Sequence, residues 1–101
     1  MSFENKIALV TGGSRGIGKA VVERLCDQKA KVYFTYHHNK ESAESLSSST
    51  GAIGMPCSQK DGERIDTTIQ SIIKQEKKID LLVNNAGITS DQFMMMMSFE
   101  Q

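Results

Sequence analysis

The chain has 101 residues, and its 12 Lys and Arg side chains balance its 12 Asp and Glu side chains. This length suits one domain with one hydrophobic core, and the balanced charge argues against nucleic acid or an anionic membrane surface as a partner. No apolar run approaches the ~20 residues that a membrane-spanning helix needs, and no apolar leader segment follows Met1. We therefore expect a cytoplasmic domain whose partners are small molecules or proteins.

The cysteines and histidines do not form a metal-binding pattern. Cys26 and Cys57 lie far apart and form no Cys-x-x-Cys pair, so neither a disulfide framework nor a zinc site is predicted. The adjacent His37 and His38 supply fewer ligands than the three or four of a usual zinc site. We expect no metal and a reducing compartment.

The chain opens with a strand pattern and then a helix pattern. Residues 6–10 form a continuous apolar run, which is typical of a strand buried on both faces of a parallel sheet. After the glycines that follow, Ile17, Val21 and Leu25 recur every fourth residue, with charged residues between them. This spacing predicts an amphipathic helix that packs this apolar face on the sheet.

A second strand, a short helix and a weaker third strand follow. Residues 31–35 are rich in β-branched and aromatic side chains and predict a strand. In the polar stretch after it, only Ala43 and Leu46 are expected to be buried. Residues 52–55 contain a glycine and meet Pro56, which cannot donate to a central ladder, so this strand is expected at the sheet edge.

A third helix and a fourth strand complete the alternation. A helical stripe of isoleucines predicts the helix: Ile65, Ile69, Ile72 and Ile73. Lys77 and Lys78 suit the carboxyl end of this helix. Residues 79–83 predict the next strand, with Asp80 near its start. Four strands separated by helices predict an α/β fold, a Rossmann-like doubly wound parallel sheet truncated to about four strands in the order 3-2-1-4, with helices on both faces.

The last residues resemble the start of a further helix. Residues 98–101 read Ser-Phe-Glu-Gln and match the Ser-x-x-Gln capping box. Because one helical turn is not stable alone in water, we expect the chain to stop inside an element; a free tail is the alternative.

A glycine-rich segment joins the first strand to the first helix. Gly12, Gly16 and Gly18 stand there, and a bound diphosphate needs backbone amides and a helix N-terminus at close range. We expect Gly12 to make the turn, Gly16 to admit the diphosphate and Gly18 to let the helix approach the strand. A glycine turn without a ligand is the alternative.

Part of this segment also fits the phosphate loop of nucleotide triphosphatases. Residues 13–19 read G-x-x-x-x-G-K. The next position, however, is Ala20, which has no oxygen for magnesium, and no later strand ends in the Asp that this class uses. A P-loop NTPase therefore stays a remote alternative.

The end of the second strand predicts which dinucleotide is bound. An NAD-binding fold places an acid there, against the ribose 2′-hydroxyl, but residues 35–40 contain none, and Glu41 is the first. Arg15 can make charge-assisted bonds to a 2′-phosphate, and His37 or Lys40 can add to the field. NADP(H) is therefore the expected cofactor; a solvated loop is the alternative for the residues after the strand.

Two motifs together resemble the short-chain dehydrogenase/reductase family. Residues 11–18 match T-G-x-x-x-G-x-G, and residues 84–87 read N-N-A-G. Within the family, residues 6–10 and 85–91 are most similar to the 3-oxoacyl-[acyl-carrier-protein] reductases of fatty acid synthesis. The resemblance implies an NADPH-dependent reductase of 3-oxoacyl thioesters. For a full-length form it also implies acyl carrier protein or an acyl thioester as partner, and a homo-oligomer.

The resemblance also implies cofactor contacts. It puts His37 beside the 2′-phosphate, Ser58 and Gln59 at the adenine, and the following residues at the phosphates and riboses: Gly12, Gly13, Ser14, Arg15, Gly16, Ile17, Gly18, Asn85, Ala86 and Gly87. The chain departs from the family's pattern at residues 58–59, where an acid or amide followed by Val is common, and at Ser90, where Arg is common.

No residue matches the family's catalytic Asn, Ser and Tyr-x-x-x-Lys. Tyr36 and Lys40 have the Y-x-x-x-K spacing but follow the second strand, so we interpret the match as coincidence. Residues 1–101 are thus expected to be the N-terminal cofactor-binding part of one domain, without its catalytic part. Residues 93–97, mostly methionine, are expected in a packed loop, with substrate lining as the alternative.

The alternative to an enzyme fragment is a small protein that binds NADP(H) or a partner without catalysis. The fourth strand, residues 79–83, is apolar on both faces. Without further strands it would leave the kind of open edge that soluble proteins avoid. The state of that edge therefore discriminates between the two hypotheses.

Overall fold

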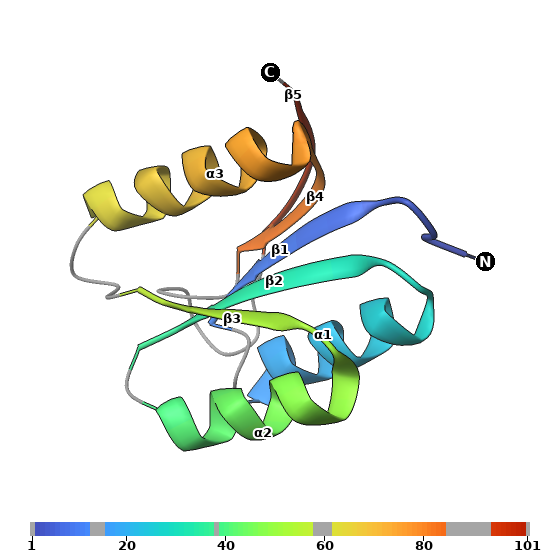
Figure 1. The fold of residues 1–101 in the computed structure, drawn as a ribbon, viewed down its shortest axis with the longest axis vertical. Coiled ribbons are helices and arrows are strands. Elements are labelled where there is room, and N and C mark those ends of the chain that lie inside the picture. The colour runs from blue at the N-terminus through green and yellow to red at the C-terminus, as the bar shows by residue number, and fades with distance from the viewer. Residues whose placement is uncertain (1, 13–15, 38, 58–61, 85–93, 101) are drawn as a thin grey trace.

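The computed structural model describes residues 2–12, 16–37, 39–57, 62–84 and 94–100. Within them the chain alternates between strand and helix and ends in two strands (Figure 1): β1 (Ile7–Thr11), α1 (Gly16–Asp27), β2 (Lys31–Tyr36), α2 (Lys40–Thr50), β3 (Ile53–Pro56), α3 (Gly62–Glu76), β4 (Lys78–Asn84) and β5 (Met94–Glu100).

The strands form one sheet in the order β3-β2-β1-β4-β5. The first four strands are parallel, with Leu9 of β1 opposite Tyr33 on one side and Leu82 on the other. Helices α1 and α2 cover one face of the sheet, and α3 covers the other (Figure 1). The predicted doubly wound α/β fold with strand order 3-2-1-4 is confirmed.

The fifth strand was not predicted. β5 runs antiparallel to β4, with Val83 opposite Met95 and Ile79 opposite Phe99. The expected helix start at residues 98–101 is therefore wrong as far as Glu100, and the expected loop at residues 93–97 is wrong from Met94 onward. A capping box offers two local hydrogen bonds, whereas pairing along β4 gives the backbone a ladder. The edge of β4 is consequently paired.

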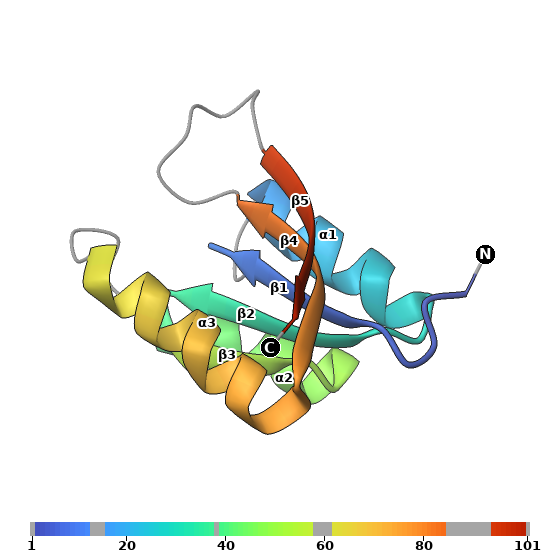
Figure 2. The same cartoon turned by 90° about the horizontal axis from the view of Figure 1, so that it is seen from above.

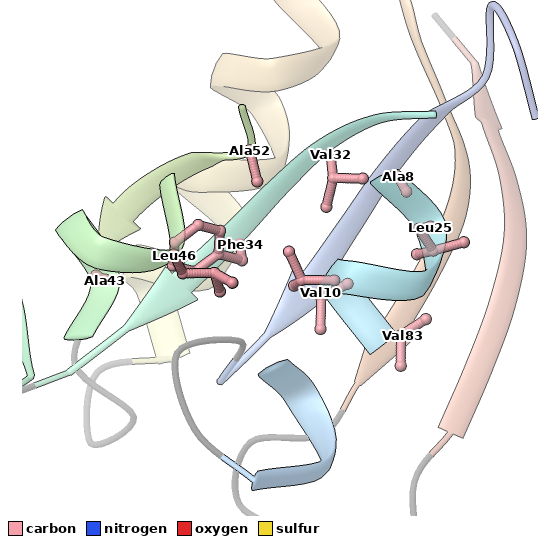
Figure 3. Close-up of a cluster of buried hydrophobic side chains, with 10 residues drawn as sticks. Ala8, Val10, Leu25, Val32, Phe34, Ala43, Leu46, Ala52 and Val83 are labelled. Carbon is pink, nitrogen blue, oxygen red and sulfur yellow. The ribbon is translucent and has the colours of Figure 1, made fainter. Parts of the chain in front are cut away.

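Apolar side chains fill both faces of the sheet, because successive residues of a strand point to opposite faces. The cluster shared with α1 and α2 is drawn in Figure 3 and includes Ala8, Val10, Leu25, Val32, Phe34, Ala43, Leu46, Ala52 and Val83. The cluster on the α3 side consists of Ile7, Leu9, Tyr33, Ile72, Ile73, Ile79 and Leu82. The alternation explains why β1 reads as a continuous apolar run.

Helix α1 packs on the sheet with a face one residue away from the predicted one. Its buried residues are Gly18, Val22 and Leu25, whereas Ile17 is 42% exposed. Of the predicted stripe, only Leu25 is fully buried, since Val21 is half-buried. Gly18 has no side chain to hold the helix away from the sheet, so the helix contacts the sheet along the Gly18 side.

Burial is confirmed at four other residues of the predicted helices, whereas Ile69 of α3 is half-buried and the side chain of Ile65 lies outside the described part. Ala43 and Leu46 are the buried residues of α2, and Ile72 and Ile73 of α3 are buried. β3 lies at the sheet edge, where Pro56 faces Tyr36 of β2. The sheet can accept this proline because an edge strand has only one paired side.

Candidate functional site

The carboxyl ends of the parallel strands meet at one edge of the sheet, where α1 begins (Figure 2). From β1 the chain moves to β2 and β3 on one side and then returns to β4 on the other. Ligands of open α/β sheets bind at such a reversal of strand order, outside the carboxyl ends. This edge is therefore the candidate functional site.

The carboxyl end of β1 is tied to both neighbouring strands. The Thr11 hydroxyl donates to the Val83 carbonyl of β4 at 3.4 Å, and the Gly12 amide donates to the Thr35 hydroxyl of β2 at 3.0 Å. Thr11 and Thr35 are both buried. Gly12 has a φ of 68°, in the left-handed region, so the chain leaves the sheet in a conformation that costs other residues roughly 1–2 kcal/mol.

Helix α1 begins at Gly16, which also has a positive φ of 58°. Among the described residues, a Cβ added at Gly16 would meet no heavy atom within 4 Å, so backbone conformation rather than space favours glycine here. The first turn of α1 contains no acidic residue. The partial positive charge of this helix N-terminus is therefore not offset by acids of its own first turn, which suits an anion.

The segment after β2 carries positive charge and no acid before Glu41. His37 is exposed, and Lys40 opens α2, where the Asn39 side chain makes no capping hydrogen bond. Lys40 also lies 4.0 Å from Glu44 in an exposed pair. A 2′-phosphate reaching this segment would meet the ammonium of Lys40 before any carboxylate of the sequence.

A polar pocket of about 570 Å³ lies between α1 and α2 and borders this segment; it is lined by Gly16, Lys19, Glu23, Asn39, Glu41, Ser42, Ser45, Leu46 and Ser49. Because Glu23 and Glu41 are both negatively charged, the pocket as a whole does not favour an anion. Its contact with the candidate site is through Gly16 and Asn39, which flank the two segments described above.

The described part of the predicted site gathers at the same sheet edge: Gly12, Gly16, Ile17, Gly18 and His37. Predicted site residues outside the described ranges are Gly13, Ser14, Arg15, Ser58, Gln59, Asn85, Ala86 and Gly87. In sequence, each predicted segment follows the carboxyl end of a parallel strand: β1, β2, β3 or β4. The roles assigned to these residues remain predictions.

Sequence reasoning missed Thr35. Its hydroxyl, 3.0 Å from the Gly12 nitrogen, joins β2 to the glycine segment. The available signal was a threonine directly after the run Val32, Tyr33 and Phe34, since a buried hydroxyl without a hydrogen bond is costly. Such a residue at the carboxyl end of a strand should have been considered as part of the site.

Other chemistry is limited within the described residues. Tyr36 ends β2 and Lys40 begins α2, so they do not lie one turn apart on one helix. No group of three or more His, Cys, Asp or Glu side chains in the described part could hold a metal ion. No described helix is long and apolar enough to cross a membrane.

Comparison with known sequences points to one family. The sequence model of the short chain dehydrogenase family matches residues 6–101. The 3-oxoacyl-[acyl-carrier-protein] reductase FabG of Escherichia coli K12 is 42% identical over 103 aligned positions, which cover all of this chain and 42% of that protein. FabG of Staphylococcus epidermidis is 34% identical and is also covered over 42% of its length. The chain thus spans less than half the length of these relatives.

Solved structures agree with the sequence comparison. A short chain dehydrogenase from Burkholderia cenocepacia J2315, in complex with NADP, matches with a TM-score of 0.81 and 34% identity over 87% of this chain and 38% of that one. BdcA in complex with NADPH matches with a TM-score of 0.71 and 37% identity over 85% of this chain and 34% of that one. On the family match, the sheet order and the sequence identities together, the chain belongs to the short chain dehydrogenase family.

Proposed function

We propose that residues 1–101 form the NADP(H)-binding part of a short-chain reductase. The observation that carries this proposal is the charge around the carboxyl end of β2. Exposed His37 and Lys40 precede the first acid, Glu41, and the N-terminus of α1 at the same edge has no acid in its first turn. A carboxylate at the end of β2 would repel a 2′-phosphate, and it is missing from this segment of the sequence.

The proposed contacts divide by chemical group. The glycine segment, from Gly12 to Gly18, offers amides and a helix N-terminus to the diphosphate. Arg15 binds the 2′-phosphate through charge-assisted hydrogen bonds, with His37 beside it. Ser58 and Gln59 face the adenine, and residues 85–87 pass the ribose. Bound NADPH would supply the hydride for reduction.

For the complete protein we propose reduction of a 3-oxoacyl-[acyl-carrier-protein] to the 3-hydroxyacyl form in the cytoplasm. Support comes from 42% identity to the E. coli FabG reductase along the whole of this chain. Residues 1–101 supply the cofactor half of that reaction and no catalytic Tyr or Lys. The partner of the complete protein would be acyl carrier protein or an acyl thioester, and its assembly a homo-oligomer.

A second candidate is an NADP(H)-binding module without catalysis, and the paired edge of β4 supports it, because β5 pairs with β4 from Lys78 to Asn84. β5 is then the edge strand of the described sheet, so the pairing moves the open edge by one strand. Both candidates bind the same cofactor at the same sheet edge, so cofactor binding tests what they share.

The test is a pair of substitutions measured with two cofactors. Arg15→Ala should weaken binding of NADPH about tenfold, as expected for loss of a charge-assisted bond, and change binding of NADH much less. Arg24→Ala removes the same side chain from an exposed position in the last turn of α1, away from the glycine segment, and is the matched control. Calorimetric titration measures both. Equal losses of affinity for NADPH and NADH in Arg15→Ala would show that Arg15 does not bind the 2′-phosphate. Tight binding of Mg-ATP would favour the NTPase alternative.

A further inference from the structure

The hydroxyl of Thr35 holds the first residue of the glycine segment. The Gly12 nitrogen lies 3.0 Å from Thr35 Oγ1, and Thr35 is only 5% exposed. A buried hydroxyl is costly unless it is hydrogen-bonded, and this one accepts from the amide at which the chain turns out of the sheet with a φ of 68°. The bond therefore fixes the Gly12 amide, at the point where the chain turns out of the sheet.

The position of Thr35 connects two parts of the candidate site. The paired register of β1 and β2 ends at Val10 and Phe34, and the Thr35 side chain continues the connection one residue farther. Thr35 also lies two residues before His37, near the end of β2. The Thr35 side chain thus connects the glycine segment to the end of β2. The residues that follow this end include His37, which is expected at the 2′-phosphate.

We propose that Thr35 is a positioning residue for the cofactor diphosphate. By accepting from Gly12, its hydroxyl fixes the direction in which the glycine segment leaves β1 and so places the amides that follow. Thr35 does not itself touch the cofactor. This inference rests on the proposed function, because it needs a diphosphate at the glycine segment.

The test compares three variants at equal folded concentration. Thr35→Val keeps the shape and β-branching of the residue but removes the acceptor; it should weaken NADPH and NADH about tenfold each, because both cofactors share the diphosphate. Thr35→Ser restores the hydroxyl and should bind within about threefold of the wild type. Thr68→Val makes the same change at another buried threonine, in α3, and should bind as the wild type does.

The two cofactors distinguish the role of Thr35 from that of Arg15. Arg15→Ala should lower the affinity for NADPH selectively, whereas Thr35→Val should leave the ratio of the NADPH and NADH affinities unchanged. If the wild type binds NADPH and Thr35→Val binds it equally well, the positioning role is wrong while the proposed function stands. If the folded wild type binds neither cofactor, the proposed function fails and the positioning role with it.

A second measurement requires no variant to fold. Hydrogen exchange of the Gly12 amide, followed by NMR on the wild type with ¹⁵N-labelled glycine, should show strong protection at pH 7. Exchange at the rate of an unstructured glycine would overturn the inference.

Discussion

The carboxylate of Asp80 accepts a hydrogen bond from the backbone amide of Ile7, with 2.8 Å between the nitrogen and Oδ2. This bond joins the amino ends of β4 and β1, the two central strands whose carboxyl ends flank the candidate site. The Lys78 ammonium lies 3.1 Å from the same oxygen. Burial alone would raise the pKa of Asp80, but the Ile7 amide and Lys78 together lower the pKa below its ordinary 3.8.

Asp80 should make the stability of the fold depend on pH in the acid range. Because its pKa is lower in the folded chain, its stabilisation is complete above the ordinary value of 3.8 and is lost as the pH falls through the folded value. Asp80→Ala should cost about 2 kcal/mol at neutral pH, and Asp80→Asn, which keeps an acceptor for Ile7 without the charge, about 1 kcal/mol. Urea unfolding at neutral pH measures both.

The acid range provides the control for this prediction. The difference in unfolding free energy between wild type and Asp80→Asn should shrink when the pH is lowered well below 3.8. Glu23→Gln, which removes an exposed carboxylate of α1, should stay within about 0.5 kcal/mol of the wild type throughout. A constant difference between wild type and Asp80→Asn at every pH would show that Asp80 acts without its charge.

Tyr33 and Lys31 at the start of β2 hold Glu76 at the end of α3. The Tyr33 hydroxyl donates to the Glu76 carboxylate, and Lys31 Nζ lies 2.5 Å from Oε2. Hydrogen bonds from Lys31 and Tyr33 lower the pKa of Glu76, against the effect of burial. Tyr33→Phe should destabilise the fold by about 1 kcal/mol, and the pKa of Glu76 should rise toward its ordinary 4.5.

The measurements for this pair are urea unfolding and ¹³C NMR of the Glu76 carboxyl. Lys31→Gln should cost only a few tenths of a kcal/mol, because the Lys31 side chain is about half exposed and its ion pair is screened. Tyr36→Phe, on the opposite face of β2, is the hydroxyl control. An unchanged Glu76 titration in Tyr33→Phe would contradict the prediction.

Two helices end on a lysine in the left-handed conformation, where glycine is preferred. Lys29, two residues after α1, has a φ of 73°, and Lys77, directly after α3, has a φ of 74°; Gly51, directly after α2, has a φ of 83°. Lys29→Gly and Lys77→Gly should each stabilise the fold by about 0.5–1 kcal/mol. Gly51→Ala should cost about 1 kcal/mol through conformation alone, since an added Cβ would meet no atom of the described part of the chain within 4 Å. Thermal unfolding of the three variants checks all three signs.

Gly54 in the edge strand β3 should resist substitution for a different reason. A Cβ there would lie 3.0 Å from Phe34 Cζ and 3.3 Å from Tyr36 Cε1, and Phe34 is fully buried. Gly54→Ala should therefore destabilise the fold by about 1–2 kcal/mol through overpacking, although alanine is ordinarily the better strand residue by roughly 0.5–1 kcal/mol. The sign of the change in unfolding free energy decides between these two effects.

The order of the elements from β1 to β4 was predictable because each of them is specified by its local sequence pattern. The apolar run before Thr11 predicts β1, and the isoleucine stripe that ends at Ile73 predicts α3; the structure contains both. Parallel strands joined by helices then leave few topologies. The site could be predicted at the carboxyl ends of the parallel strands, because the glycine segment directly follows the carboxyl end of β1.

Failures of prediction occurred where distant contacts decide. Ser98 offers a good local helix cap, yet its segment pairs with β4, and a ladder along another strand leaves little trace in local sequence. Ile17 fits a helical stripe, but α1 buries the neighbouring Gly18 and leaves Ile17 exposed. The role of Thr35 depends on Gly12, 23 positions away, and no spacing rule connects them.

The most direct test of the central claim is calorimetric titration of the 101-residue chain with NADPH and with NADH under identical conditions. The proposal predicts that NADPH binds at least about tenfold more tightly, the preference expected when a 2′-phosphate meets cations and no carboxylate. Equal or tighter binding of NADH, or no binding of either cofactor by a chain that circular dichroism shows to be folded, would contradict it.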